Sequence, residues 1–251
     1  MKDERNSLVG VERTVRILRA LEQAEQANLA DLARSVQLSE ATVLRYLTSL
    51  VAVGFVERSD TSRYRLGWEI FRLGQRALTG HVPREVVRPA MEALLAEFNE
   101  TVNLAYRKGD EVVIVEVFEG MRAVKKLSDV GQSDPWHASA LGKALMASMP
   151  DAEWQRLLAQ TGMPTFTSHT ISDIPAMQAE IDAIRRRGHA IDHEESDEDL
   201  TCVAAVVPNP SGMPQFALSV SFLTHRLAGD TLDHAATRVA EAAGQIGRRL
   251  H

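Results

Sequence analysis

The stretch AIDHEESDEDLTC, residues 190–202, concentrates side chains that can do chemistry. It contains His193, a run of carboxylates and Cys202, the only cysteine among the 251 residues. Carboxylates and histidines can bind metals or transfer protons, and a cysteine thiolate can act as a nucleophile. Four interpretations therefore compete: a catalytic cluster, a metal site, a pocket for a small molecule, and a solvated acidic loop.

Catalysis by Cys202 is disfavoured by its surroundings. A nucleophilic thiolate needs a nearby base and an electropositive setting that lowers its pKa. Cys202 instead begins a predicted strand of Val and Ala behind an acidic loop, which disfavours the thiolate. A single cysteine also excludes an intrachain disulfide and agrees with a reducing compartment.

A metal site at this stretch would use His189 and His193, which flank a predicted strand. Four residues of strand place them on the same side but about 13 Å apart, at a rise of ~3.3 Å per residue. That separation is too large for one ion. We therefore expect neither a bound metal nor another cofactor.

Composition limits the class of protein. No apolar run approaches the ~18 residues of a membrane helix, and residues 1–10 lack the apolar centre of a signal peptide. We expect a soluble, cytoplasmic protein that does not bind membranes. The net charge of −6 is uneven, because residues 1–80 carry 12 Lys and Arg against 10 Asp and Glu, whereas the remainder carries 16 against 24. This asymmetry favours an interaction module joined to a second domain.

Three helices and a hairpin are predicted within residues 1–67. Apolar residues recur at helical spacing in VERTVRILRALEQ, LADLARSV and EATVLRYLTSLVAVG. Two strand-like runs, FVERS and RYRLG, follow and are separated by a turn. This order is typical of a winged helix-turn-helix, whose third helix enters the major groove of DNA. We expect the following apolar residues to face inward: Val11, Val15, Leu18, Leu21, Val43, Leu47, Leu50 and Val51.

The exposed side of this unit supplies candidate DNA contacts. Side chains on the first half of the third helix can meet base edges or phosphates, and hairpin arginines can reach the backbone or minor groove. The alternative is a three-helix bundle whose arginines form only a solvated surface. The candidate DNA-binding residues are Ser39, Thr42, Arg45, Tyr46, Arg58, Arg63 and Arg65.

The rest of the chain predicts a linker helix over residues 68–82 and a second domain over 83–251. TVNLAYRKGDEVVIVEVFEG reads as two strands, AVKKL as a possible continuation, and HAID, TCVAAVVPN and QFALSVSF as three more. A helix entered through Asp134 as its cap is predicted in DPWHASALGKALMASM. Helices separate the strand groups, so the fold class is α+β rather than a repeating βαβ unit.

Three segments together resemble the IclR family of bacterial transcriptional regulators: the helix-turn-helix over LADLARSVQLSEATVLRYLTSLVAVGFVE, the motif HASALGKALMA, and the segment from RRRGHAIDHEE to FALSVS. The resemblance covers nearly the whole chain. It implies a winged helix-turn-helix, a linker helix and a GAF-like α/β effector-binding domain. It also implies a homodimer or homotetramer, an inverted-repeat operator in double-stranded DNA, and a small effector that is a carboxylic or aromatic acid.

The resemblance also implies where the effector binds. The HASALG turn would offer backbone N–H groups, which suit an anion at a helix N-terminus. Two serines of one strand would point the same way towards the ligand. The alternative is that the serines satisfy backbone groups and that the cysteine is simply core. The implied effector-binding residues are Ala123, Ser139, Ala140, Leu141, Asp192, Cys202, Ser219 and Ser221. Trp136 departs from the family pattern, and it is a further candidate that could narrow the pocket or stack on an aromatic ligand if it faces the pocket.

We therefore expect a DNA-binding transcriptional regulator that acts as a repressor, is controlled by a small organic acid, and is not an enzyme. Asp192 has two possible roles, which are to accept a hydrogen bond from the ligand or to fix a neighbouring loop. The remaining alternative is an enzyme or metal-binding sensor on a GAF-like domain with an appended DNA-binding module.

Overall fold

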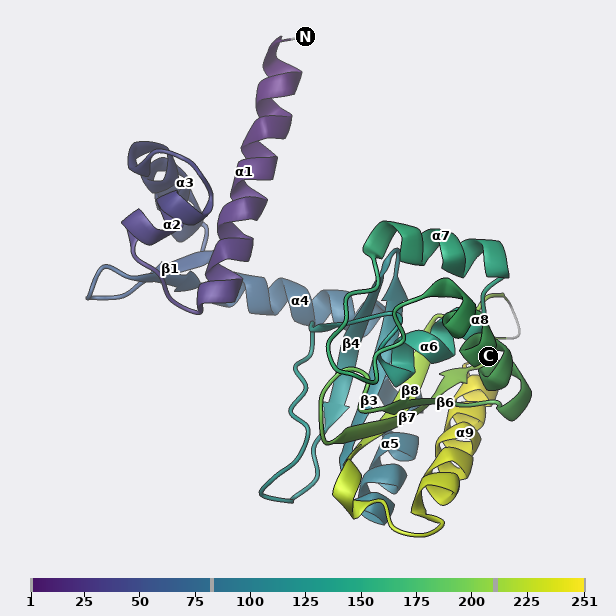
Figure 1. Ribbon diagram of the computed structural model, residues 1–251. Coiled ribbons are helices and arrows are strands. Elements are labelled where there is room, and N and C mark those ends of the chain that lie inside the picture. The colour runs from purple at the N-terminus through teal and green to yellow at the C-terminus, as the bar shows by residue number, and fades with distance from the viewer. Residues whose placement is uncertain (1, 82–83, 210–211, 251) are drawn as a thin grey trace. The chain divides into compact units, whose positions relative to one another are not determined.

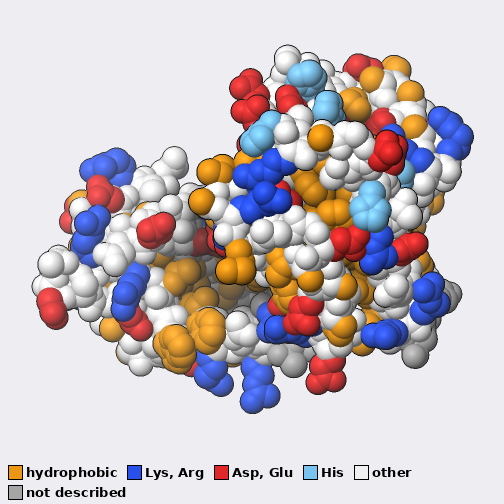
Figure 2. Space-filling view, turned by 90° about the horizontal axis from the view of Figure 1, so that it is seen from below, with side chains coloured by type: hydrophobic (Ala, Val, Ile, Leu, Met, Phe, Trp, Pro, Cys, Tyr) orange, Lys and Arg blue, Asp and Glu red, His pale blue; other side chains and the backbone are white. Residues whose placement is uncertain are grey.

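The computed structural model describes residues 2–81, 84–209 and 212–250, and the chain divides into two compact units, Met1–His81 and Val82–His251. The predicted boundary at residues 82 and 83 lies outside the described residues. Side chains of both charges are interspersed with hydrophobic ones over the face shown in Figure 2. No helix of the described residues is long and apolar enough to cross a membrane.

The first unit has the predicted order of three helices and a hairpin (Figure 1). A fourth helix follows the hairpin and belongs to the same unit. The elements are α1 (Lys2–Ala24), α2 (Leu29–Ser35), α3 (Glu40–Ala52), β1 (Val56–Arg58), β2 (Tyr64–Leu66) and α4 (Trp68–His81).

The core of the first unit is formed by the C-terminal part of α1 with α2, α3 and the hairpin. Ile17 and Leu21 of α1 and Val43 and Leu47 of α3 are fully buried. The prediction that the apolar side chains face inward was wrong for three valines. Periodicity identifies an apolar stripe on a helix but not which part of the stripe packs against other elements. Val11, Val15 and Val51 are 61%, 41% and 38% exposed.

Local geometry fixes the turn between α2 and α3. Gln37 adopts a left-handed φ of 53°, and Ser39 caps α3 by accepting a hydrogen bond from the Thr42 amide at 3.3 Å. Such a cap is worth about 1 kcal/mol. Arg16 of α1 donates to the Val36 carbonyl, which ties the first helix to this turn. These contacts fix the turn that leads into α3.

The second unit contains a six-stranded antiparallel sheet with strand order β5-β4-β3-β8-β7-β6. Helices α6, α7 and α8 cover one face of the sheet, and α5 and α9 cover the other (Figure 1). The strands are β3 (Thr101–Lys108), β4 (Glu111–Phe118), β5 (Ser133–Asp134), β6 (Ala190–His193), β7 (Leu200–Val207) and β8 (Phe216–Leu223). The helices are α5 (Arg84–Phe98), α6 (Ala140–Ala147), α7 (Asp151–Thr161), α8 (Ile174–Arg187) and α9 (Thr231–Arg249), with a short 3-10 helix at Thr224–Arg226.

The connection between β4 and α6 differs from its prediction. AVKKL forms no strand, and Asp134 lies in β5 instead of capping the helix. The cap is Ser139, whose hydroxyl accepts from the Gly142 amide at 3.0 Å. A Cβ on Gly142 would lie 2.5 Å from the Trp136 carbonyl, so glycine is what lets the preceding turn close onto the helix. The observed cap therefore lies five residues beyond the predicted cap Asp134, and α6 begins at Ala140.

Candidate functional site

The strand register places polar side chains in rows on one face of the sheet. Asp192 pairs with Cys202, Cys202 with Ser221, and Ser219 with Asn103. Side chains of register partners point to the same face, as do residues two apart on one strand. This is the face covered by α6, because Ala204 and Cys202 pack in the same cluster as the helix.

A cavity of about 210 Å³ lies between these rows and the start of α6. Seven of the nine predicted effector-binding residues line it: Ser139, Ala140, Leu141, Asp192, Cys202, Ser219 and Ser221.

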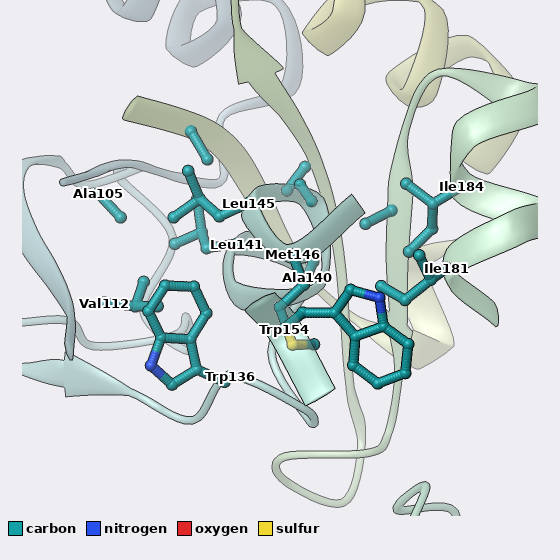
Figure 3. Close-up of a cluster of buried hydrophobic side chains, with 14 of the residues drawn as sticks. Ala105, Val112, Trp136, Ala140, Leu141, Leu145, Met146, Trp154, Ile181 and Ile184 are labelled. Carbon is teal, nitrogen blue, oxygen red and sulfur yellow. The ribbon is translucent and has the colours of Figure 1, made fainter. Parts of the chain in front are cut away.

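Trp136 and Ala123 do not line this cavity. Trp136 is 4% exposed and lies next to Val112 in the buried hydrophobic cluster (Figure 3). Its indole Nε1 donates to the Asp110 carbonyl at 2.8 Å, which anchors the ring away from the cavity. Ala123 is exposed on the segment between β4 and β5. The tight turn before α6 points the Trp136 side chain into the core, and sequence spacing did not reveal this direction.

The first turn of α6 presents hydrogen-bond donors to the cavity. The first amides of a helix have no carbonyl partner within the helix, and the helix dipole favours negative charge there. Ser139 accepts from Gly142, whereas the amides of Ala140 and Leu141 have no acceptor among the described residues. An anionic group of a ligand could accept from both.

Asp192 fixes a loop rather than presenting a free carboxylate. It accepts hydrogen bonds from the Glu195 amide at 2.8 Å, the Ser196 amide at 3.3 Å and the Ser196 hydroxyl at 2.6 Å. Burial raises the pKa of Asp192, while the bonds from Ser196 and Glu195 and the charge of Lys143 oppose the rise. The geometry supports the second of its two predicted roles.

The cavity contains one lysine and further carboxylates that the sequence did not point to. Lys126 pairs with Asp197 at 2.6 Å, and this pairing raises the pKa of Lys126 although burial opposes it. Asp134 also lines the cavity. Burial raises the pKa of Asp134 to about 6, with Asp192 and Asp197 adding to the rise and Lys126 opposing it. The other lining residues that sequence reasoning missed are Asn103, Ser128, Gln132, Pro135, Phe166, Ser196 and Leu200.

Cys202 has the character of a buried wall residue. Its thiol donates to the Ser221 hydroxyl at 3.2 Å. Burial, together with the charge of Asp192, raises the pKa of Cys202 well above its usual value. Ser221 also accepts from Asn103 Nδ2 at 3.4 Å, so its own O–H can donate into the cavity. A thiol in this state is a poor nucleophile.

A buried ion pair supports the loop behind the cavity. Lys143 of α6 is fully buried, and it donates to the Ile191 carbonyl at 2.5 Å and to Glu195. Burial raises the pKa of Glu195 to about 7, and Lys143 opposes the rise. The sequence did contain a signal for this ion pair, because Lys143 lies in a helix whose other inward positions are apolar. A buried lysine needs a partner of opposite charge.

His189 precedes β6 and His193 ends it. His193 Nδ1 lies 3.2 Å from the Thr201 hydroxyl. Burial is the main cause that lowers the pKa of His189, with Arg187 adding to the effect. Across the part of the chain that the structure describes, no group of three or more His, Cys, Asp or Glu is placed to hold a metal ion.

The predicted DNA-contacting side chains of α3 have different surroundings. Arg45 is exposed, with its guanidinium carbon 5.8 Å from the centre of the Tyr46 ring. Tyr46 is half-buried and packs against the core. Ser39 and Thr42 are joined through their hydroxyls at 2.8 Å. Arg45 is therefore the freest of the four to reach a base edge.

The three hairpin arginines also differ in how they are held. Arg65 forms two hydrogen bonds to Glu57 directly across the hairpin, at 2.8 and 2.9 Å. Arg58 donates to the Ser62 hydroxyl at 2.9 Å. The Arg63 guanidinium has no hydrogen bond or ion pair among the described residues. The charge of Arg63 is thus available, while that of Arg65 is already neutralised.

A winged helix-turn-helix and a separate sheet domain with a polar cavity define a DNA-binding regulator with a ligand-sensing domain. Residues 75–248 match the family model of the bacterial transcriptional regulator IclR C-terminal domain, and residues 10–60 match that of the IclR helix-turn-helix domain. The chain belongs to the IclR family, which confirms the resemblance, and it is a DNA-binding transcriptional regulator with a C-terminal effector-binding domain.

Relatives and solved structures agree with this assignment. The chain is 32% identical to the HTH-type transcriptional repressor AllR of Klebsiella pneumoniae over 86% of its length and 80% of the relative's. It is 28% identical to the HTH-type transcriptional regulator KdgR of Dickeya chrysanthemi over 98% and 81%. An IclR homolog from Microbacterium hydrocarbonoxydans, solved with 4-hydroxybenzoate, matches with a TM-score of 0.83, 25% identity and coverage of 96% and 98%.

Proposed function

We propose that this regulator represses transcription by binding an inverted-repeat operator through α3 and the hairpin. A small carboxylic acid bound in the cavity changes the affinity for that operator. The observation that carries the proposal is the cavity itself. Its lining combines the two open amides of α6, the hydroxyl of Ser221 and the ammonium of Lys126, all of which donate hydrogen bonds. Donors converging on one small space suit an oxyanion.

On the DNA-binding side, five of the seven predicted residues have a proposed role. Arg45 would read base edges, because arginine pairs with guanine through two hydrogen bonds in the major groove. Arg63 and Arg58 would contact phosphates, which set register but carry no sequence information. Ser39 and Thr42 stand at the start of α3, where a phosphate suits the helix dipole.

The protein is proposed to act as a homodimer or homotetramer in the cytoplasm. An inverted repeat presents two half-sites related by a two-fold axis, and binding both requires two copies of the DNA-binding unit. The cytoplasm follows from a role on chromosomal DNA. Light scattering of the purified chain, with and without an operator fragment, measures the number of copies.

The proposal is tested with the non-coding DNA beside the gene. Fluorescence anisotropy should show tighter binding to this fragment than to random DNA at the same salt concentration, and a candidate acid should change that affinity. Absence of any preference, with and without acids, would refute the proposed function.

The enzyme alternative depends on Cys202 as a nucleophile. We propose that the chain has no catalytic activity, because the raised thiol pKa and the bond to Ser221 keep Cys202 protonated. Cys202→Ser should retain DNA binding and shift only the response to acid. A substrate-turnover activity that disappears in this variant would contradict the proposal.

A further inference from the structure

The side chain of Asn103 carries a hydrogen-bond acceptor that the protein leaves unused. Asn103 is 4% exposed and lines the cavity, and its Nδ2 donates to the Ser221 hydroxyl at 3.4 Å. Its Oδ1 is buried and has no hydrogen-bond partner among the described residues. A buried acceptor without a donor costs free energy, which a ligand can recover by supplying the missing N–H or O–H.

A second acceptor in the same cavity is the carboxylate of Asp134. It lies on β5, lines the cavity and has no side-chain hydrogen bond within the described part of the chain. Its neighbours differ from those of the other two cavity carboxylates, because Asp192 is held by Ser196 and Asp197 by Lys126. Asp134 is therefore the carboxylate with free capacity.

The lining as a whole is unsuited to an apolar ring. Eleven of the seventeen described residues that line the cavity are polar or charged. Phe166 is the aromatic residue among those seventeen, and it is 49% exposed. An aromatic ligand would have to desolvate Asn103, Asp134 and Lys126 without replacing their hydrogen bonds, which costs affinity.

We propose that the effector is a small aliphatic carboxylic acid that also carries a hydroxyl or amino group. Its carboxylate lies at the open amides of Ala140 and Leu141, and its donor group lies against Asn103 Oδ1 and Asp134. This inference rests on the proposed function, and it narrows the effector from organic acids in general to donor-bearing aliphatic acids.

Calorimetric titration of the full chain with four acids of similar size tests the proposal. The probes are butyrate, 4-hydroxybutyrate, 4-aminobutyrate and benzoate. Satisfying a buried acceptor is expected to make at least one substituted acid bind about tenfold or more tightly than butyrate and benzoate. The proposal is overturned if butyrate or benzoate binds as tightly as, or more tightly than, both substituted acids. It is also overturned if none of the four acids binds at millimolar concentration.

Two cavity variants locate the preference. Asn103→Leu keeps a similar volume and should reduce the affinity for 4-hydroxybutyrate about tenfold while leaving that for butyrate unchanged. Asp134→Asn, which keeps the shape of the side chain, should lower the affinity for 4-aminobutyrate more than that for butyrate. Gln160→Leu makes the same kind of change at an exposed position of α7 and should alter none of these affinities. Retention of the full preference in both cavity variants refutes the assignment.

Asn103→Ser serves as the second variant should Asn103→Leu fail to fold, and circular dichroism reports folding. The calorimetric titration measures acid binding in the absence of DNA. If the substituted acids bind as expected but no DNA preference exists, the proposed function fails and this inference stands. If DNA binding responds only to butyrate or benzoate, the inference fails and the proposed function stands.

Discussion

The two units handle polar groups in opposite ways. In the first unit the buried cluster contains apolar side chains and Tyr64, and the charged side chains proposed to touch DNA are exposed. In the second unit Asn103, Asp192, Lys143, Ser219 and Ser221 are buried on one side of the sheet. A surface that binds a polyanion needs only exposed charge, whereas a cavity for a small acid must bury polar groups and satisfy most of them.

Because of this difference, we expect substitutions in the two units to affect stability and function differently. Exposed side chains of the first unit can be removed without leaving an unsatisfied partner inside the protein. Buried groups of the second unit are linked by hydrogen bonds through Lys143, Glu195 and Asp192. Removing one of them therefore leaves another buried polar group without its partner.

Lys143→Met should have the largest effect. It removes the cation beside Glu195 and leaves a buried carboxylate without an opposite charge. We expect the free energy of unfolding to fall by about 3–5 kcal/mol at pH 8, measured by urea denaturation. The control is Lys108→Met, whose ion pair with Glu111 is exposed and whose loss should cost less than about 1 kcal/mol. Equal losses in both variants would contradict the contrast.

Arg45→Ala should reduce recognition without reducing stability. The side chain is exposed on α3, and a base contact by arginine is worth about 1–3 kcal/mol of discrimination. Anisotropy titrations with operator and random DNA should therefore converge, while the urea midpoint stays at that of the unmodified protein. Arg34→Ala, which removes an exposed α2 arginine paired with Asp31, is the control and should leave the discrimination intact. Loss of discrimination in both variants would show that bulk charge, not base reading, is responsible.

Asp134→Asn should stabilise the protein in a pH-dependent manner. The pKa of Asp134 is about 6, above its usual value of 3.8, so the folded chain holds this proton more tightly than the unfolded chain. The ionised carboxylate therefore costs stability at neutral pH, and the cost disappears as the pH falls from about 7 to about 4. We expect the variant to gain about 1–2 kcal/mol at pH 8 and nothing near pH 4, measured by urea denaturation. A gain that persists undiminished at pH 4 would rule out the ionised carboxylate as its source.

The hairpin arginines should show the smallest effects. Arg63→Ala removes an available charge, so the slope of log affinity against log salt should fall by about 1. The double change of Glu57→Ala with Arg65→Ala removes a neutral pair and should leave the slope unchanged. Anisotropy over a salt series measures both. A reversed result, with the double variant losing the slope and Arg63→Ala keeping it, would mean that Arg65 leaves Glu57 on binding DNA.

The sequence predicted the elements of the first unit well, because short amphipathic helices and a turn-linked hairpin are local features. It misassigned the packing of Val11, Val15 and Val51, since exposure depends on which neighbours arrive from elsewhere in the chain. In the second unit it located Ser219, Ser221 and Cys202 through resemblance and strand periodicity. It missed Asn103, Lys126 and Asp134, which lie far from the acidic stretch along the chain.

Sequence patterns alone indicated the family, most of the order of helices and strands, and the alternation that sets both serines on one side of β8. The tertiary structure decided which polar groups share the cavity and which are already satisfied. Asp192 bonds its own loop, Trp136 turns into the core, and Asn103 Oδ1 is buried without a donor among the described residues. The physical reason is that local pattern fixes side-chain direction along one element, whereas hydrogen-bond partnership depends on groups brought together across several strands and helices.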